Sequence, residues 1–189
     1  METRDWTDRE FDPSKGPILV KVSTVERLFN SLDPQPLDVR DLDVEIADWI
    51  GEWADEQRRD APITIEVLVA DNSAAGLEPM VVSGIHNHFA YRRWASARQL
   101  SRLWRDGRIS LVIGLTTLVT LTTASRLLVT SGDGASLTLR EGLAVAGWVA
   151  MWHPMQIFLY DWWPLRRELR TYQRLAEATI IFSDPSPTR

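Results

Sequence analysis

The chain has 189 residues, of which 44% are hydrophobic and 25% are charged, and its formal net charge is −5. These fractions are typical of a folded protein rather than of a disordered one. The chain contains no cysteine, which excludes a disulfide framework, a thiol nucleophile, an iron–sulfur cluster and a cysteine zinc site.

The N-terminal part predicts a strand and a short helix after a polar leader. Residues 1–17 are polar and acidic, lack the apolar segment of a secretory signal, and are predicted to be disordered. Ile18–Val22 predicts a strand because it is rich in β-branched residues. Residues 25–32 predict a short helix, which the prolines at positions 34 and 36 end.

Residues 41–56 form a clear amphipathic helical pattern. Its apolar face is predicted to be core and consists of Leu42, Ile46, Trp49, Ile50 and Trp53. Its acidic face repeats at the same spacing and consists of Asp41, Glu45, Asp48, Glu52 and Asp55. The simplest interpretation of the acidic face is a solvated surface, and the alternative is a docking face for a basic protein partner.

A second strand and a long helix follow. Residues 63–70 predict a strand, and residues 78–106 predict a helix that continues toward an apolar run. Two strands alone are only marginally stable. We therefore expect a small N-terminal α+β cytoplasmic domain over residues 18–106, in which the strands pair beneath the acidic helix or are completed by a partner chain.

Two runs without any charged residue, 109–125 and 142–160, are long enough to cross a bilayer. With their neighbours they predict transmembrane helices at about 109–128 and 140–161, joined by a short turn into a hairpin over residues 107–163. Arginines flank both outer ends and are absent from the turn, which predicts that both termini are cytoplasmic. The alternative is a pair of buried core helices in a water-soluble protein.

The flanks of the hairpin carry residue types that favour the membrane surface. Arginines are attracted to anionic lipid headgroups, and tryptophans concentrate at membrane interfaces. The predicted membrane-surface contacts are Arg98, Arg102, Arg105, Arg108, Trp162, Trp163, Arg166, Arg167 and Arg170. Residues 164–189 predict a cytoplasmic interfacial helix followed by a disordered tail; the apolar face of that helix consists of Leu165, Leu169, Tyr172 and Ala176.

Charge is strongly segregated along the chain. Residues 1–78 contain 19 acidic and 8 basic residues, whereas residues 79–108 contain one acidic residue and 6 arginines. An acidic domain of this kind does not suit nucleic acid, because nucleic-acid binding depends on neutralising phosphates. The expected partners are therefore membrane lipids and a protein, either a different one or further copies of this chain.

His153 lies within the second charge-free run, inside the predicted span, and is a weak cofactor candidate. The preferred interpretation is a hydrogen bond between the two helices, and a proton, quinone or haem role is the alternative. Small and polar residues at helical spacing are predicted to pack the helices together or against another subunit: Thr116, Thr120, Gly142, Ala146, Ala150 and His153. His86 and His88 lie two apart in a helical context, so they do not share a face for one metal ion.

No nucleotide-binding, zinc-protease or nucleophile-elbow motif occurs in the sequence. We therefore expect neither an enzyme nor a cofactor or metal site. The segments 28–36, 40–43, 107–115 and 140–168 resemble a group of small uncharacterised bacterial inner-membrane proteins with two transmembrane helices. The resemblance implies a bacterial inner-membrane location and brings no activity with it.

The function expected from the sequence is that of a non-enzymatic inner-membrane anchor that presents an acidic cytoplasmic domain to a protein partner. Two alternatives belong to other classes. The first is an accessory subunit of a larger respiratory or photosynthetic membrane complex, with His153 near a cofactor. The second is a membrane-bound enzyme that acts on lipid through Asp161, Arg166 and Arg167 at the cytoplasmic interface.

Overall fold

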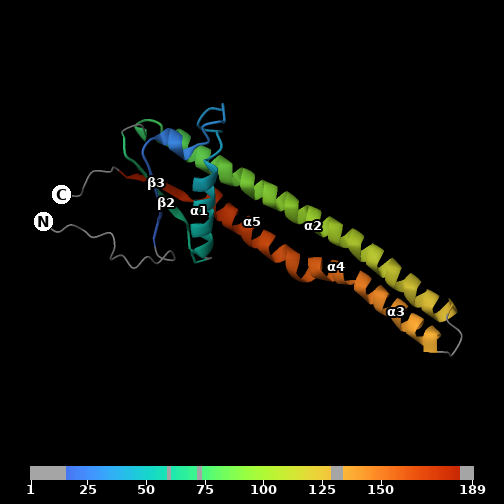
Figure 1. Ribbon diagram of the computed structural model, residues 1–189. Helices are drawn as coiled ribbons and strands as arrows, with labels where there is room; N and C mark the ends of the chain where they lie inside the picture. Colours follow the sequence, from blue (N-terminus) through green and yellow to red (C-terminus); the bar gives the residue numbers. More distant parts are fainter. Residues whose placement is uncertain (1–15, 59–60, 72–73, 129–133, 184–189) are drawn as a thin grey trace. The chain divides into compact units, whose positions relative to one another are not determined.

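The computed structural model describes residues 16–58, 61–71, 74–128 and 134–183 (Figure 1). The predicted disorder of residues 1–17 and of the tail therefore lies mostly outside the described residues. The chain divides into two compact units. The first, which we call the α/β unit, comprises residues up to 94 and from 168 onward, and the second, the hairpin unit, comprises residues 95–167.

The described part of the α/β unit contains one sheet of three parallel strands, β1 (Ile18–Val22), β2 (Thr64–Val69) and β3 (Thr179–Ser183), in the order β1-β2-β3. Val20 is paired with Val67, and Val67 with Phe182. The two strands expected from the sequence are confirmed. The third strand was not predicted, because the segment 164–189 was expected to hold only an interfacial helix and a disordered tail.

Parallel strands need crossover connections, and helices supply them here. The 3-10 helix η1 (Val25–Leu28) and α1 (Val44–Glu56) connect β1 to β2. The connection from β2 to β3 is much longer and contains the entire hairpin unit. The unit is thus α/β rather than the expected α+β, since its helices lie between consecutive parallel strands.

The core of the α/β unit lies between one face of the sheet and the helices, with α1 crossing the sheet in Figure 1. Ile18, Ile65 and Val67 are at most 1% exposed and contribute the sheet side. Ile50 of α1 and Leu175 of α5 (Trp162–Ala176) are equally buried and contribute the helix side. The sequence predicted an interfacial helix within residues 164–189. The C-terminal end of α5 is instead part of this core.

The amphipathic pattern of residues 41–56 is confirmed as a helix, but its buried face is centred differently. Ala47, Ile50 and Ala54 are the buried residues of α1. Trp49 was expected in the core and is instead 36% exposed, with its ring 5.3 Å from that of Trp53. Small alanines allow α1 to approach the sheet closely, which leaves the larger indole at the rim.

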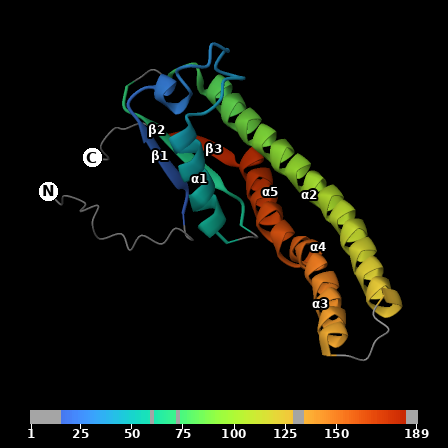
Figure 2. The same ribbon diagram turned by 45° about the vertical axis from the view of Figure 1, so that its right-hand side comes forward.

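The hairpin unit consists of two long helical segments that run side by side in both ribbon views (Figure 2). The first is the continuous helix α2 (Glu78–Leu128) from residue 95 onward. The second comprises α3 (Gly134–Ala150), α4 (Trp152–Gln156), η3 (Ile157–Asp161) and the start of α5. Both are long and apolar enough to cross a membrane. Only 11% and 17% of their most apolar windows are buried within the molecule, which distinguishes them from buried core helices and suggests membrane association.

Candidate functional site

The acidic residues in and just before α1 have different structural roles. Asp43 begins the helix, because its side chain accepts hydrogen bonds from the backbone N–H groups of Glu45 and Ile46 at 3.0 and 3.3 Å. The helix therefore starts at Val44. Asp41 precedes it and is not on the helical face to which the sequence assigned it.

Three of the five acids predicted to dock a partner are engaged inside the α/β unit. Asp41 Oδ1 lies 3.1 Å from His88 Nδ1, and Asp48 Oδ1 lies 3.2 Å from Arg92. Asp55 Oδ1 accepts a hydrogen bond from Thr171 Oγ1 at 3.2 Å. Asp48 and Asp55 thus connect α1 to α2 and α5, and Asp41 connects the residues just before α1 to α2.

The other two predicted docking residues, Glu45 and Glu52, are exposed on the side of α1 that faces away from the core. Glu56 and Trp49 belong to the same side and complete a continuous surface. We call these four residues the acidic face of α1. Helical spacing identified two of its members. Glu56 was missed because it falls outside the five-residue acidic stripe, and Trp49 because its apolar ring suggested the core.

His88 is buried beneath the start of α1. Its Nδ1 atom lies 3.1 Å from Asp41 Oδ1 and 3.3 Å from the backbone nitrogen of Leu42. Among the described residues, its Nε2 atom has no hydrogen-bond partner and is buried. Burial lowers the pKa of His88 below its ordinary value of 6.5, and the hydrogen bond with Asp41 acts in the opposite direction.

We expect this histidine to make the α/β unit less stable in mild acid. Because the pKa is lower in the folded than in the unfolded chain, protonation favours unfolding. The free energy of unfolding therefore falls as the pH drops below about 6.5 toward the lower pKa of the folded chain. The charged groups Asp41, Asp48 and Arg92 face the imidazole. Urea unfolding between pH 7.5 and 5.5 should show this decline in the parent protein and a weaker one in His88→Asn, whose side-chain oxygen can replace the acceptor. An identical decline in both would contradict the assignment.

His86 has a separate structural partner: its Nε2 atom lies 2.9 Å from the backbone oxygen of Ala178, just before β3. The two histidines thus contact different parts of the unit. In the ranges that the structure describes, no group of three or more His, Asp or Glu side chains could hold a metal ion.

Arg174 fixes α5 to the end of α1. Its guanidinium donates to the backbone oxygens of Ala54, Arg58 and Ala61 at 3.3, 2.9 and 2.9 Å. A cation at this position also complements the carbonyl end of the helix dipole. The sequence counted this arginine among the positive residues that follow the second apolar run, but the structure gives it a role in packing.

Replacing Arg174 by methionine is expected to lower the free energy of unfolding of the α/β unit by about 1–3 kcal/mol, because the three carbonyls lose a charged donor. Arg170→Met is the matched control, since Arg170 lies one turn earlier and is exposed. Denaturant unfolding followed by tryptophan fluorescence compares the two. Equal losses would show that the carbonyl contacts contribute nothing specific.

The segment before α1 is a compact loop. The Asp33 carboxylate accepts hydrogen bonds from the backbone N–H groups of Asp41 and Gln35, and these bonds lower its pKa. Phe29 and Leu42 form an antiparallel bridge at its base. Leu32 is nevertheless 88% exposed, so an apolar side chain projects from a fixed loop. The helix predicted over residues 25–32 is only the 3-10 helix Val25–Leu28, and residues 29–32 belong to this loop.

The two helical segments of the hairpin unit contact each other through a row of small residues. A Cβ atom on Gly107 would lie 2.8 Å from Ile157 Cγ2, and one on Gly114 would lie 2.8 Å from the backbone oxygen of Ala150. A Cβ atom on Gly147 would meet Leu118 at 3.0 Å. The row therefore joins positions 107, 114 and 118 of α2 to positions 157, 150 and 147.

Ala150, one of the residues predicted to pack the helices together or against another subunit, lies at this contact. The others are exposed and do not lie at it, so packing against another subunit stays a prediction for them: Thr116, Thr120, Gly142, Ala146 and His153. The same contacts place His153 level with position 111 of α2. Gly142 and Gly147 have similar surroundings in sequence, and only the register decides which one lies at the contact.

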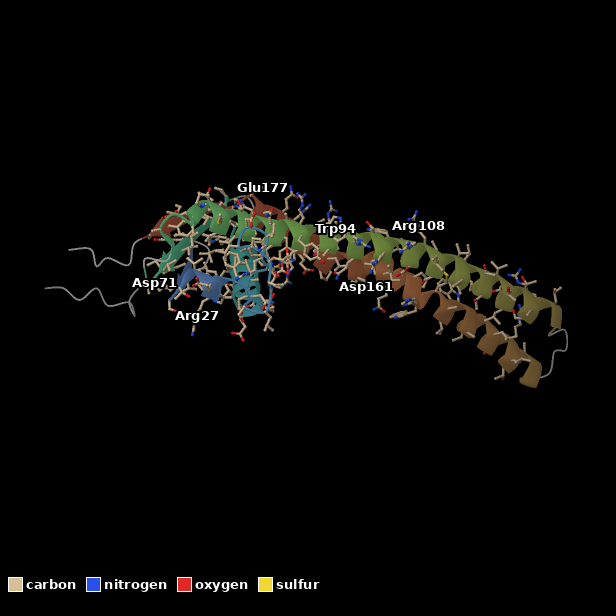
Figure 3. All side chains as sticks on the ribbon, turned by 90° about the horizontal axis from the view of Figure 1, so that it is seen from above. Arg27, Asp71, Trp94, Arg108, Asp161 and Glu177 are labelled. Atoms are coloured by element: carbon tan, nitrogen blue, oxygen red, sulfur yellow. The ribbon has the colours of Figure 1, made fainter. Side chains whose placement is uncertain are left out.

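All but one of the predicted membrane-surface residues are exposed. Arg170 belongs to the α/β unit and the others to the hairpin unit, where Figure 3 shows Arg108 extending away from the other helical segment. Trp162 is the half-buried exception: its indole donates to the backbone oxygen of Phe158 at 2.9 Å and lies 6.3 Å from the ring of Trp104. The Arg166 guanidinium lies 5.7 Å from the centre of the Trp162 ring. Contact with lipid remains a prediction for all of them.

Comparisons with protein-family models, with curated proteins and with solved structures gave no match to this chain. The resemblance drawn from the sequence segments consequently stays a prediction, as do its implied bacterial source and location.

Proposed function

We propose that this protein is a non-enzymatic anchor of the bacterial inner membrane that binds a protein partner on the cytoplasmic side. The hairpin unit would cross the membrane, and the α/β unit would present the acidic face of α1 to a basic, partly apolar surface of the partner. The observation that carries the proposal is this face: three exposed carboxylates surround an exposed tryptophan on one side of a single helix.

The proposed topology is supported by the sheet. Because β3 pairs with β2, the two ends of the hairpin return to one folded unit and so belong on the same side of a membrane. The exposed apolar windows of both helical segments supply the spanning surface. Arginines at the ends nearest this unit favour the cytoplasmic side.

The composition of the acidic face favours a protein partner over bare solvation. Tryptophan is enriched in the energetic centres of protein interfaces, and complementary charge speeds association and selects partners. Trp49 supplies the apolar anchor, whereas Glu45, Glu52 and Glu56 would attract Lys and Arg side chains. An anionic membrane surface repels the same face, which leaves it directed toward the cytoplasm.

The lipid-enzyme alternative is less well supported. It requires Asp161, Arg166 and Arg167 to converge on a polar cavity. Both arginines are exposed, and the Arg166 guanidinium lies over an indole ring. This arrangement suits residues that anchor a helix at an interface better than residues that surround a substrate.

Site-specific photo-crosslinking in intact cells tests the proposal. A photoreactive residue at Glu52 should give an adduct of defined mass, and one at exposed Glu26 on η1 should not. The double reversal Glu45→Lys, Glu56→Lys should abolish the Glu52 adduct without lowering the amount of protein in the membrane. An adduct that survives the reversal, or equal adducts from both positions, would overturn the docking role.

Topology is tested separately with reporter fusions. A reporter at either terminus is expected to be active only in its cytoplasmic form, and a reporter inserted beside Gly134 only in its periplasmic form. The opposite pattern, or release of the protein from membranes by alkaline carbonate, would overturn the anchor itself.

A further inference from the structure

On the second helical segment of the hairpin unit, one row of residues contacts α2, and a neighbouring row on a different side does not. Gly147, Ala150, Pro154 and Ile157 recur at spacings of three and four and form the row that lies against α2. This is the heptad spacing of helices that pack side by side over several turns. One row per helix is sufficient to hold a two-helix hairpin.

The other row has the same spacing and no partner in the hairpin. Its six members are all exposed: Gly142, Ala146, Val149, His153, Gln156 and Tyr160. A Cβ atom on Gly142 would meet nothing within 4 Å. We call this set the outer row. Its small residues would let another helix approach closely, and its polar residues are unusual on a surface that faces lipid.

We propose that the outer row is the interface through which two copies of this chain associate in the membrane. The proposal rests on the membrane insertion put forward above. Within the described part of the chain, neither the His153 nor the Gln156 side chain makes a hydrogen bond inside the hairpin. His153 lies about one turn, or roughly 6 Å, inside the level at which Ile157 meets Gly107. Within a bilayer, the imidazole of His153, which carries a donor and an acceptor, would favour contact with a polar group over contact with lipid hydrocarbon.

A second copy fits these residues better than an unrelated helix. Two copies inserted with the same topology are related by a two-fold axis along the membrane normal, which brings identical positions together at the same depth. Neutral imidazole and carboxamide groups each contain a donor and an acceptor, so His153 and Gln156 can pair with their own counterparts. An unrelated helix would need matching polar groups at both depths.

Cysteine scanning tests the interface directly, because the chain contains no cysteine of its own. Single variants Ala146→Cys and Val149→Cys are expected to form disulfide-linked dimers in oxidised native membranes. Val145→Cys and Val112→Cys are matched controls: both parent residues are more than 60% exposed, but they lie outside the outer row. The expected signature is crosslinking that follows the spacing of the outer row.

The polar contribution is tested in the Val149→Cys background. Adding His153→Leu should lower the dimerisation constant by about threefold to tenfold, as expected for an interhelical hydrogen bond in a bilayer. Adding His153→Gln should restore it, because the carboxamide keeps a donor and an acceptor. Equal crosslinking by His153→Leu and the parent, or equal crosslinking at Val112 and Val149, would overturn the proposed interface.

The two proposals fail in distinguishable ways. If the reporters show a membrane hairpin but the outer row gives no crosslinks, the dimer is wrong and the anchor stands. A single crosslinked heterologous protein in place of a homodimer would also overturn the second copy and would assign the outer row to another subunit. If the chain does not insert into membranes, both the anchor and the dimer are wrong.

Discussion

Truncation after Glu177 is expected to unfold the α/β unit, although it removes only residues 178–189. The truncation removes Ala178, which is 4% exposed, and all of β3. Ile180 and Phe182 would no longer pack against the core, and β2 would lose its pairing from Thr64 to Leu68. We expect a loss of about 5 kcal/mol or more, which is comparable with the whole stability of many small domains.

The matched control for this truncation ends at Ser183 and keeps the strand. Limited proteolysis of both proteins in mild detergent is the measurement, because cleavage within α1 requires the unit to open. The shorter chain should be cut rapidly in α1 and the longer chain slowly. Equal resistance would show that the sheet is stable with two strands.

Gly114→Leu is expected to disrupt the contact between the two helical segments of the hairpin. Pro154 has no N–H group, so the carbonyl of Ala150 lacks its usual helical donor four residues later. Gly114 packs against this carbonyl, and a Cβ atom on residue 114 would lie only 2.8 Å from the Ala150 backbone oxygen. A leucine should therefore cost about 3 kcal/mol of packing energy, at the upper end for an overpacked contact.

An intramolecular disulfide reports on this contact. The pair Leu118→Cys and Gly147→Cys replaces the two residues that meet there, and its closure should make the monomer migrate faster on a gel. Gly114→Leu should reduce closure strongly, and Gly142→Leu should leave it unchanged because nothing lies within 4 Å of that site. Unchanged closure in both variants would mean that the observed register is wrong.

The same glycine variants separate packing within the hairpin from packing between chains. Gly142 belongs to the outer row, so Gly142→Leu should weaken the proposed dimer without affecting the intramolecular disulfide. Gly114 lies on the inner contact, and its replacement should affect the intramolecular disulfide first. The two readouts thus assign each side of the second helical segment to a different neighbour.

The sequence predicted those elements whose signal lies among neighbouring residues. The β-branched run of β1 and the alternation of β2 gave both strands, and helical spacing gave α1. The continuous helix through Asp106 and the two apolar segments also followed from local composition, because run length and charge decide whether a helix can cross a membrane.

The candidate site was only partly predictable. Helical spacing placed Glu45 and Glu52 on an exposed face, but it could not show that Asp48 pairs with Arg92 or that Asp55 meets Thr171. Those partners are 44 and 116 residues away. A row of acids looks the same in sequence whether its members meet solvent or a distant side chain. Only the fold could therefore show which of these acids pair with distant residues.

By itself, the sequence determined that this chain joins an acidic domain to two long apolar helices, since these properties depend on composition and on spacing within single elements. The tertiary structure decided that the five residues of β3 complete a parallel sheet from the far end of the chain. It also decided that Gly147 and Ala150 close the hairpin, while Gly142, Ala146 and His153 face outward. Strand pairing and helix register depend on contacts between distant segments, and no local pattern specifies which of two similar faces will be buried.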